Sequence, residues 1–310
     1  MTTLRSFIAC VLLLVSLFSA TAATYTLQIS DIAWTGGSGS YNCFSGAAYP
    51  NTVNFTITKT ANGRQNYAVT AGPSKNTGTY TRQLKSGANR LNYQMYTTSG
   101  MNYVLKAPTV ATANEVISGS LVGQAGQVLP LSFVFYIPPG QVVPPGSYTD
   151  QLTISIYNAY NSVGSPYDTR TISVTAVVAA GAAVSIVPTG SSFNSSNPQL
   201  TLNFGALSLG QNQSCDVLIK QNNNCTVYYS SANNGVLKQV PTPTADQIPY
   251  TCVVFGSALD LTHSGSLPLP SGVSPGPDGN RYPLTVTIGD PSNASAGTYQ
   301  DQITITVQAQ

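Results

Sequence analysis

A near-copy of one short segment, 151 residues further along the chain, constrains this sequence more than any other feature. Residues 146–156 read GSYTDQLTISI and residues 297–307 read GTYQDQITITV. Two weaker echoes lie upstream, where PLSFVF at Pro130 matches PLTVTI at Pro283, and Leu91-Asn92-Tyr93 matches Ile248-Pro249-Tyr250. A repeat of this length predicts two related domains rather than a stack of short units.

The boundaries of these domains follow from two segments of small or apolar residues. Arg5, the apolar run from Phe7 to Phe18 and Ala20-Thr21-Ala22 predict a signal peptide over 1–23. The run AAGAA at 179–183 predicts a linker, which gives domains at 24–180 and 181–310. No later segment is apolar for long enough to cross a membrane, so we expect no transmembrane segment in the mature chain.

Alternating apolar and polar residues predict an all-β fold. The pattern marks strands near 52–58, 131–137, 152–156, 171–177, 200–204 and 284–288. Gly and Pro separate these runs, and no stretch has helical periodicity. We therefore expect two antiparallel β-sandwich domains.

The repeat also predicts that the C-terminal sandwich lacks its last strand. In the first copy the repeated strand is followed by a turn at 158–169 and a further alternating strand at 171–178. In the second copy only Gln308, Ala309 and Gln310 follow. An open sheet edge invites pairing with a strand from another chain. The alternative is that the second domain closes its sheet with its own N-terminal segment.

Five apolar residues are the candidates for the groove beside that open edge. On the final strand, Ile303, Ile305 and Val307 share one face. Val184 and Ile186, in the opening strand of the second domain, are expected on the opposite wall. A donor strand with alternating apolar side chains would insert between them.

Composition disfavours several other classes of protein. The net charge of +2 is too small for duplex nucleic-acid binding. The single histidine, His263, predicts no metal site, and no motif predicts a catalytic residue or a cofactor. Asp150 and Asp301 repeat at equivalent positions, so we expect them to serve the fold. A secreted enzyme is therefore the least favoured functional hypothesis, behind the two binding or structural roles described below.

Four cysteines follow the predicted signal peptide, namely Cys43, Cys215, Cys225 and Cys252. An even number in an exported chain predicts disulfides. At most one bridge can lie within the second domain, and Cys43 is either free or bridged between domains. The pairing stays open.

Three motifs resemble the spore coat protein U domain, which occurs in subunits of archaic (Csu-type) chaperone–usher pili. They are the Gly-x-Tyr-x-Asp strand, the Leu-x-Tyr strand and Asn203-Phe204-Gly205. The resemblance implies that both β-sandwich domains are immunoglobulin-like. It also implies a two-domain tip adhesin, located at the pilus tip after transit through the periplasm. It implies four partners: a periplasmic chaperone, an outer-membrane usher, an adjacent pilin that donates a strand, and a surface or host receptor. The alternative is a spore-coat or pilus-shaft subunit, for which alternation at Tyr25, Leu27 and Ile29 offers a possible donor strand.

The surface that binds such a receptor is expected on loops far from the linker. The turn at 158–169 should be distal, and alternation along the chain places 72–89 and 122–128 at the same end. The candidate contact residues are Tyr80, Leu84, Val122, Val128, Tyr160, Val163, Pro166 and Tyr167. About half of them are expected to pack inward instead. The proline-rich loop at 138–145 should lie near the linker.

Overall fold

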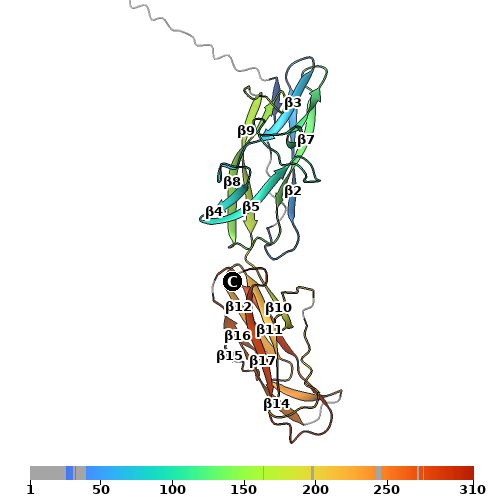
Figure 1. Ribbon diagram of the computed structural model, residues 1–310, viewed down its shortest axis with the longest axis vertical. Helices are drawn as coiled ribbons and strands as arrows, with labels where there is room; N and C mark the ends of the chain where they lie inside the picture. The colour runs from blue at the N-terminus through green and yellow to red at the C-terminus, as the bar shows by residue number, and fades with distance from the viewer. Residues whose placement is uncertain are drawn as a thin grey trace, which may run out of the picture.

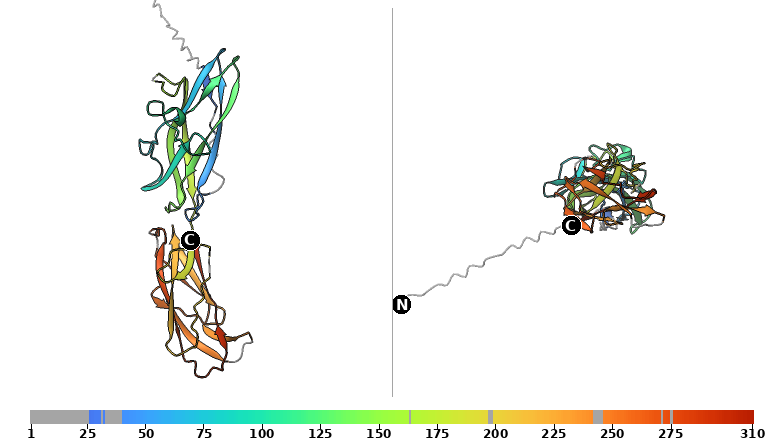
Figure 2. Two further views of the ribbon diagram at one scale, coloured as in Figure 1. Left: turned by 45° about the vertical axis from the view of Figure 1, so that its right-hand side comes forward. Right: turned by 90° about the horizontal axis from the view of Figure 1, so that it is seen from below.

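The computed structural model describes residues 26–30, 32, 40–162, 164–196, 199–241, 246–270, 272–274 and 276–310. The predicted signal peptide lies outside these residues. Figure 1 shows two elongated β units placed end to end. In the right-hand view of Figure 2, which looks along their length, one unit lies behind the other. In the described part of the chain the only helical element is the 3-10 turn η1 (Ala113–Glu115), so the all-β prediction is confirmed.

In the described residues, the first unit contains nine strands that wrap around one core. They are β1 (Leu27–Ile29), β2 (Tyr49–Lys59), β3 (Gln65–Ala71), β4 (Arg82–Ser86), β5 (Asn89–Tyr96), β6 (Ile117–Leu121), β7 (Val128–Ile137), β8 (Gly146–Tyr157) and β9 (Asp168–Val178). Their order is β1-β2-β7-β5-β4-β8-β3-β6, with β9 added beside β8. Four predicted strands fall within β2, β7, β8 and β9, where inward residues alternate with exposed ones.

The last strand of the first unit, β9, closes its sandwich. It pairs with β8 from Gly146↔Val178 to Ile156↔Asp168. On the side of β1, the Ile29 amide donates to the Asp168 carboxylate at 2.9 Å. Under this cover the inward residues of β8 are fully buried. The first unit therefore completes its fold with its own chain.

The described part of the second unit contains ten strands in two sheets. They are β10 (Ala182–Pro188), β11 (Asn212–Gln221), β12 (Cys225–Ser231), β13 (Val236–Val240), β14 (Gln247–Val254), β15 (Ser257–Ala258), β16 (Gly265–Pro268), β17 (Asn280–Ile288), β18 (Thr298–Gln300) and β19 (Ile303–Ala309). One sheet has the order β10-β11-β17-β14-β13-β18, with β15 beside β14, and the other is β16-β12-β19. The predicted strand at 284–288 lies within β17.

The predicted strand at 200–204 is absent. Burial still alternates there, and Leu200, Leu202 and Phe204 are half-buried against the second core. A run of residues becomes a strand only when a neighbouring strand accepts and donates its backbone hydrogen bonds. Among the described residues no strand pairs with this segment.

The sequence echoes correspond to one hydrogen-bond network built twice. The Tyr93 hydroxyl donates to Asp150 at 2.7 Å, and the Tyr250 hydroxyl donates to Asp301 at 2.5 Å. Each carboxylate also accepts backbone amides, including those of Asn76 and Asn233 respectively. Burial raises the pKa of both tyrosines well above the ordinary value. The two aspartates therefore serve the fold, as predicted.

The predicted disulfides are absent. Cys43, Cys215, Cys225 and Cys252 are all buried free thiols. Cys215 on β11 and Cys252 on β14 are separated by β17. Two strand spacings amount to about 10 Å, and a disulfide requires Cα atoms within about 7 Å. The other two thiols hydrogen-bond elsewhere, with Cys225 donating to Gln221 and Cys43 accepting from Asn222.

A buried asparagine in the turn between β11 and β12, Asn222, contacts both the first unit and the linker. Its side-chain amide donates to the Val143 and Ala179 carbonyls at 3.1 and 2.9 Å. Its side-chain oxygen accepts the Gly181 amide at 2.8 Å. The proline-rich loop 138–145 thus lies at the linker, as predicted.

Candidate functional site

An unpaired sheet edge runs along β19. This strand pairs with β12 from Ile303↔Ser231 to Cys225↔Ala309. In the part of the chain that the structure describes, no strand pairs with its other edge. The equivalent strand of the first unit, β8, has β3 and β4 on one side and β9 on the other.

The missing neighbour leaves apolar side chains uncovered. Ile303, Ile305 and Val307 are only partly buried, although they pack against the second core. Their counterparts on β8, which are Leu152, Ile154 and Ile156, are at most 4% exposed. The same residue types at repeated positions therefore differ in burial because only the first copy has a covering strand.

β10, the end strand of the other sheet, lies beside β19. Val184 and Ile186 on β10 are half-buried against the second core. β10 pairs only with β11 among the described strands. The half-buried Leu200 and Leu202 belong to the same incompletely covered core. We use the name acceptor groove for these partly covered apolar residues of β10 and β19.

The chemistry of the acceptor groove suits an extended apolar chain. Its wall residues are aliphatic, and each apolar side chain that becomes fully buried contributes about 1.5–3 kcal/mol. The free edge of β19 offers backbone groups to a pairing strand. The groove residues named above are valine and isoleucine, which carry no ionisable group.

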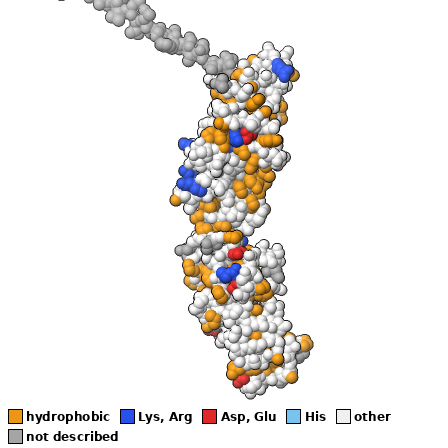
Figure 3. Space-filling view, viewed as in Figure 1, with side chains coloured by type: hydrophobic (Ala, Val, Ile, Leu, Met, Phe, Trp, Pro, Cys, Tyr) orange, Lys and Arg blue, Asp and Glu red, His pale blue; other side chains and the backbone are white. Residues whose placement is uncertain are grey.

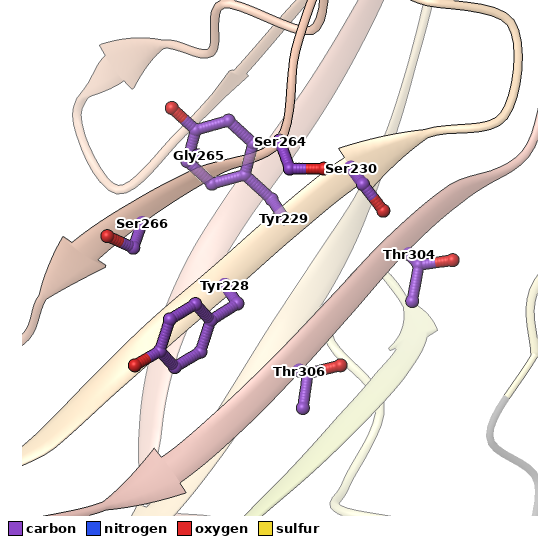
Figure 4. A pocket seen from close by; sticks show the side chains of 8 residues that line it. All are labelled: Tyr228, Tyr229, Ser230, Ser264, Gly265, Ser266, Thr304 and Thr306. Atoms are coloured by element: carbon purple, nitrogen blue, oxygen red, sulfur yellow. The ribbon is translucent and has the colours of Figure 1, made fainter.

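A shallow hollow lies on the outer face of the β16-β12-β19 sheet, away from the second core. Figure 4 shows Tyr228, Thr304 and Thr306 on this face, with Ser266 beside them. The Tyr228 ring is 42% exposed. Its lining consists of tyrosine, serine and threonine side chains together with Gly265.

Three predicted contact residues are exposed apolar side chains at the distal end of the first unit. β8 and β9 pair beside the linker at Gly146↔Val178, so the turn that connects their other ends is distal. Tyr160 in this turn is 40% exposed, and Val122 and Val128 beside the β6–β7 turn are 61% and 55% exposed. Pro166 and Tyr167 are half-buried, and Val163 lies outside the described residues.

Two of the predicted contact residues are misplaced. Leu84 is fully buried in β4, and the half-buried Tyr80 uses its hydroxyl to accept the Ala107 amide at 2.9 Å. β3 begins at the distal end, so the segment that follows it lies further toward the linker, where the Lys75 amide donates to the Gln151 carbonyl. The expectation that the 72–89 segment is distal is therefore wrong.

A buried lysine, which sequence reasoning did not single out, holds the distal turns together. Lys59 is fully buried, and its amine donates to the Gly63 carbonyl and, at 2.8 Å, to the Gly123 carbonyl. The alternation of β2 could have revealed it, because Phe55, Ile57 and Lys59 occupy every second position and therefore face the core. This contact joins the β2–β3 turn to the β6–β7 turn beside Val122.

The described residues hold neither a cluster of metal-ligand side chains nor a long apolar helix. No group of three or more His, Cys, Asp or Glu side chains there could hold a metal ion. No helix of the described chain is long and apolar enough to cross a membrane.

The fold and the groove define a two-unit β-sandwich protein with one closed and one open sandwich. The family model of the Spore Coat Protein U domain matches residues 15–155. This match spans less than half of the chain and ends within β8 of the first unit. No curated protein matches the chain.

Several solved structures resemble the chain at low identity. The chaperone–tip adhesion subunit complex CsuC–CsuE of Acinetobacter baumannii is 16% identical with a TM-score of 0.42, covering 83% of this chain and 91% of that chain. The CupB6 tip adhesin of Pseudomonas aeruginosa is 8% identical with a TM-score of 0.34, covering 91% and 94%. CfaE, the adhesive subunit of the CFA/I fimbria of enterotoxigenic Escherichia coli, is 14% identical with a TM-score of 0.32, covering 93% and 83%. These likenesses are too distant to support an argument about function.

Proposed function

We propose that the chain is the two-domain tip adhesin subunit of a chaperone–usher pilus. The second unit anchors it to the fibre by accepting a donor strand from the adjacent pilin. The first unit attaches to a surface or host receptor through its distal loops and promotes biofilm formation. The subunit is exported by its signal peptide, bound by a periplasmic chaperone, passed through an outer-membrane usher and displayed at the tip.

One observation carries this proposal: β19 is uncovered where its repeat, β8, is covered by β9. The two strands have nearly the same sequence, so the difference in burial comes from the absent neighbour. The spore coat protein U match and the resemblance of the motifs support the assignment to a pilus.

The position of β1 favours the tip over the shaft. Leu27 and Ile29 are fully buried in the core of the first unit, and β1 pairs with β2. These residues, which offered a possible donor strand, are therefore committed to their own domain. A tip subunit accepts a strand and gives none.

A charge in the acceptor groove tests the anchoring role. In Ile305→Asp the carboxylate would be buried beside the incoming strand without a partner, which is strongly unfavourable. We expect this variant to lose co-purification with its periplasmic chaperone. Thr306→Asp is the matched control, because Thr306 is exposed on the outer face of the same strand. Normal capture of the Ile305 variant would contradict the groove assignment.

The distal valines test the adhesive role. The double variant Val122→Thr/Val128→Thr keeps side-chain shape but adds two hydroxyl groups to the exposed apolar surface. We expect severalfold weaker attachment of piliated cells to polystyrene, measured under flow. Val177→Thr is the control, because Val177 is 48% exposed but lies beside the linker. An equal loss from both variants would show that the distal end has no special role.

A further inference from the structure

We propose a second binding surface on the first unit, one that recognises an acidic polysaccharide. It consists of Lys75, Lys85 and Arg90, which we call the cationic edge, on the outer face of the β4–β5 hairpin and the adjoining β8. It goes beyond the adhesive role of the distal loops, and it does not depend on the acceptor groove.

The sheet register places these cations together. Lys85 on β4 lies directly opposite Arg90 on β5, and Lys85 also pairs with Thr149 on β8. The Lys75 amine donates to the Gln151 side chain at 2.9 Å, two residues along β8 on the same exposed face. Like charges directly opposite each other in a sheet are destabilising. Such a pair is therefore unfavourable for the fold itself.

No carboxylate neutralises this edge within the described residues. Glu115 is paired with Lys106, and Asp168 is paired with Arg170. Asp150 is close in sequence but is buried, where it accepts the Tyr93 hydroxyl. Figure 3 shows Lys and Arg side chains along the edge of the first unit that carries this hairpin, with no acidic side chain beside them.

The surroundings of the charges indicate the kind of anion. Side-chain amides extend the same face, with Gln83 donating to Asn92 at 2.9 Å and Gln141 donating to the Asn92 carbonyl at 2.9 Å. Amides exchange hydrogen bonds with hydroxyl groups, and Lys and Arg bind carboxylate or sulfate groups. A chain that carries both hydroxyls and acidic groups matches this surface. A nucleic acid is a poorer match, because it requires a larger basic excess.

Binding of the full chain to immobilised dextran sulfate tests the proposal, with uncharged dextran as the matched ligand. We expect binding to dextran sulfate alone, weakened by added salt because exposed charges are screened. The double variant Lys85→Gln/Arg90→Gln should bind about tenfold more weakly, since it loses two charged contacts. Lys85→Arg should bind like the unmodified chain, because it keeps the charge. Thermal melting confirms that each variant is folded.

The control variant and a second ligand decide the outcome. Arg64→Gln removes an exposed cation at the distal end, so its binding should change by less than about twofold. If Arg64→Gln lost as much binding to dextran sulfate as the double variant, the effect would come from net charge alone, and the proposal would be overturned. Binding to polyglutamate as tight as binding to dextran sulfate would also overturn it, because the surface would then recognise charge without the sugar. Neither result would affect the groove or the valine tests.

Discussion

At the scale of single residues, the repeated Tyr–Asp pair shows what a duplication can reveal. Asp150 and Asp301 stood out because they recur, and so did Tyr93 and Tyr250. Their contact across the fold was not visible in the sequence, since each pair is more than 50 residues apart. Asn222 and Lys59 have no repeated counterpart that draws attention to them. Their roles follow from burial and from backbone carbonyls, which a sequence does not locate.

The cysteines illustrate the opposite case, in which composition misleads. An even number of cysteines in an exported chain favours disulfides, but here the sheet order separates the thiols. They instead behave as small apolar residues of the core. Burial raises the pKa of the Cys215 thiol to about 11 and that of the Cys252 thiol to about 12.

These two thiols predict a loss of stability at high pH. An ordinary cysteine has a pKa of 9.0, so the unfolded chain releases these protons at lower pH than the folded one. Their stabilising contribution is complete below pH 9.0 and is lost as the pH rises through about 11 to 12. We expect the free energy of unfolding to fall over this range more steeply than in Cys215→Ala/Cys252→Ala.

Urea unfolding at several pH values measures how steeply the free energy of unfolding falls with pH in the unmodified chain and in the double alanine variant. Subtracting the variant's profile removes the contribution of the tyrosines, whose pKa values are also raised. Parallel profiles would contradict the assignment of buried free thiols. A thiol reagent should also label all four cysteines in the urea-unfolded chain without reductant, and incomplete labelling would contradict the same assignment.

At the scale of elements, alternation located most strands of the sandwiches. β2, β7, β8, β9 and β17 all contain the runs predicted for them. The run at 200–204 has the same pattern and forms no strand, because alternation reports which side chains face a core and not whether a partner strand is present. The failure falls within the incompletely covered core of the second unit, where a partner is missing.

Loop placement was predictable only where the strand count was correct. The turn after β8 and the proline-rich loop after β7 lie at the ends expected for them. The segment after β3 does not, because β4 was not recognised as a separate strand and the alternation of ends was therefore shifted. Groove residues could be predicted because the duplication supplies a completed copy for comparison, whereas the contact loops have no such reference.

At the scale of the whole molecule, the β11–β12 turn contacts both the first unit and the end of β19, a strand of the acceptor groove. Asn222 in this turn binds the first unit and the linker. Its neighbour Asn223 donates to the Gln310 carbonyl at 2.6 Å, and the Gln310 amide donates to the Asn224 carbonyl at 2.9 Å. The end of β19 and the first unit are therefore held by consecutive residues.

Replacing Asn222 should let the two units move more relative to each other without unfolding either unit. Asn222→Ala leaves the Val143 carbonyl and the Gly181 amide without their partner, at about 1–3 kcal/mol for each group that remains buried. We expect a broader distribution of distances between spin labels at exposed Ser173 and Thr251, one in each unit. Asn223→Ala is the control, because its bond lies within the second unit. An unchanged distribution in Asn222→Ala would show that the linker alone sets the geometry.

The most direct test of the central claim uses the chain's own closing strand. Residues 158–178, which contain the turn and β9, are appended after Gln310, so that the second unit can complete itself as the first does. Several newly buried apolar side chains should raise the melting temperature of the second unit by about 10 °C or more. The same extension with the copy of Val174, an inward residue of β9, changed to Asp should give no such rise. If the complete extension left the melting temperature unchanged, the second unit would already be closed and the account would be wrong.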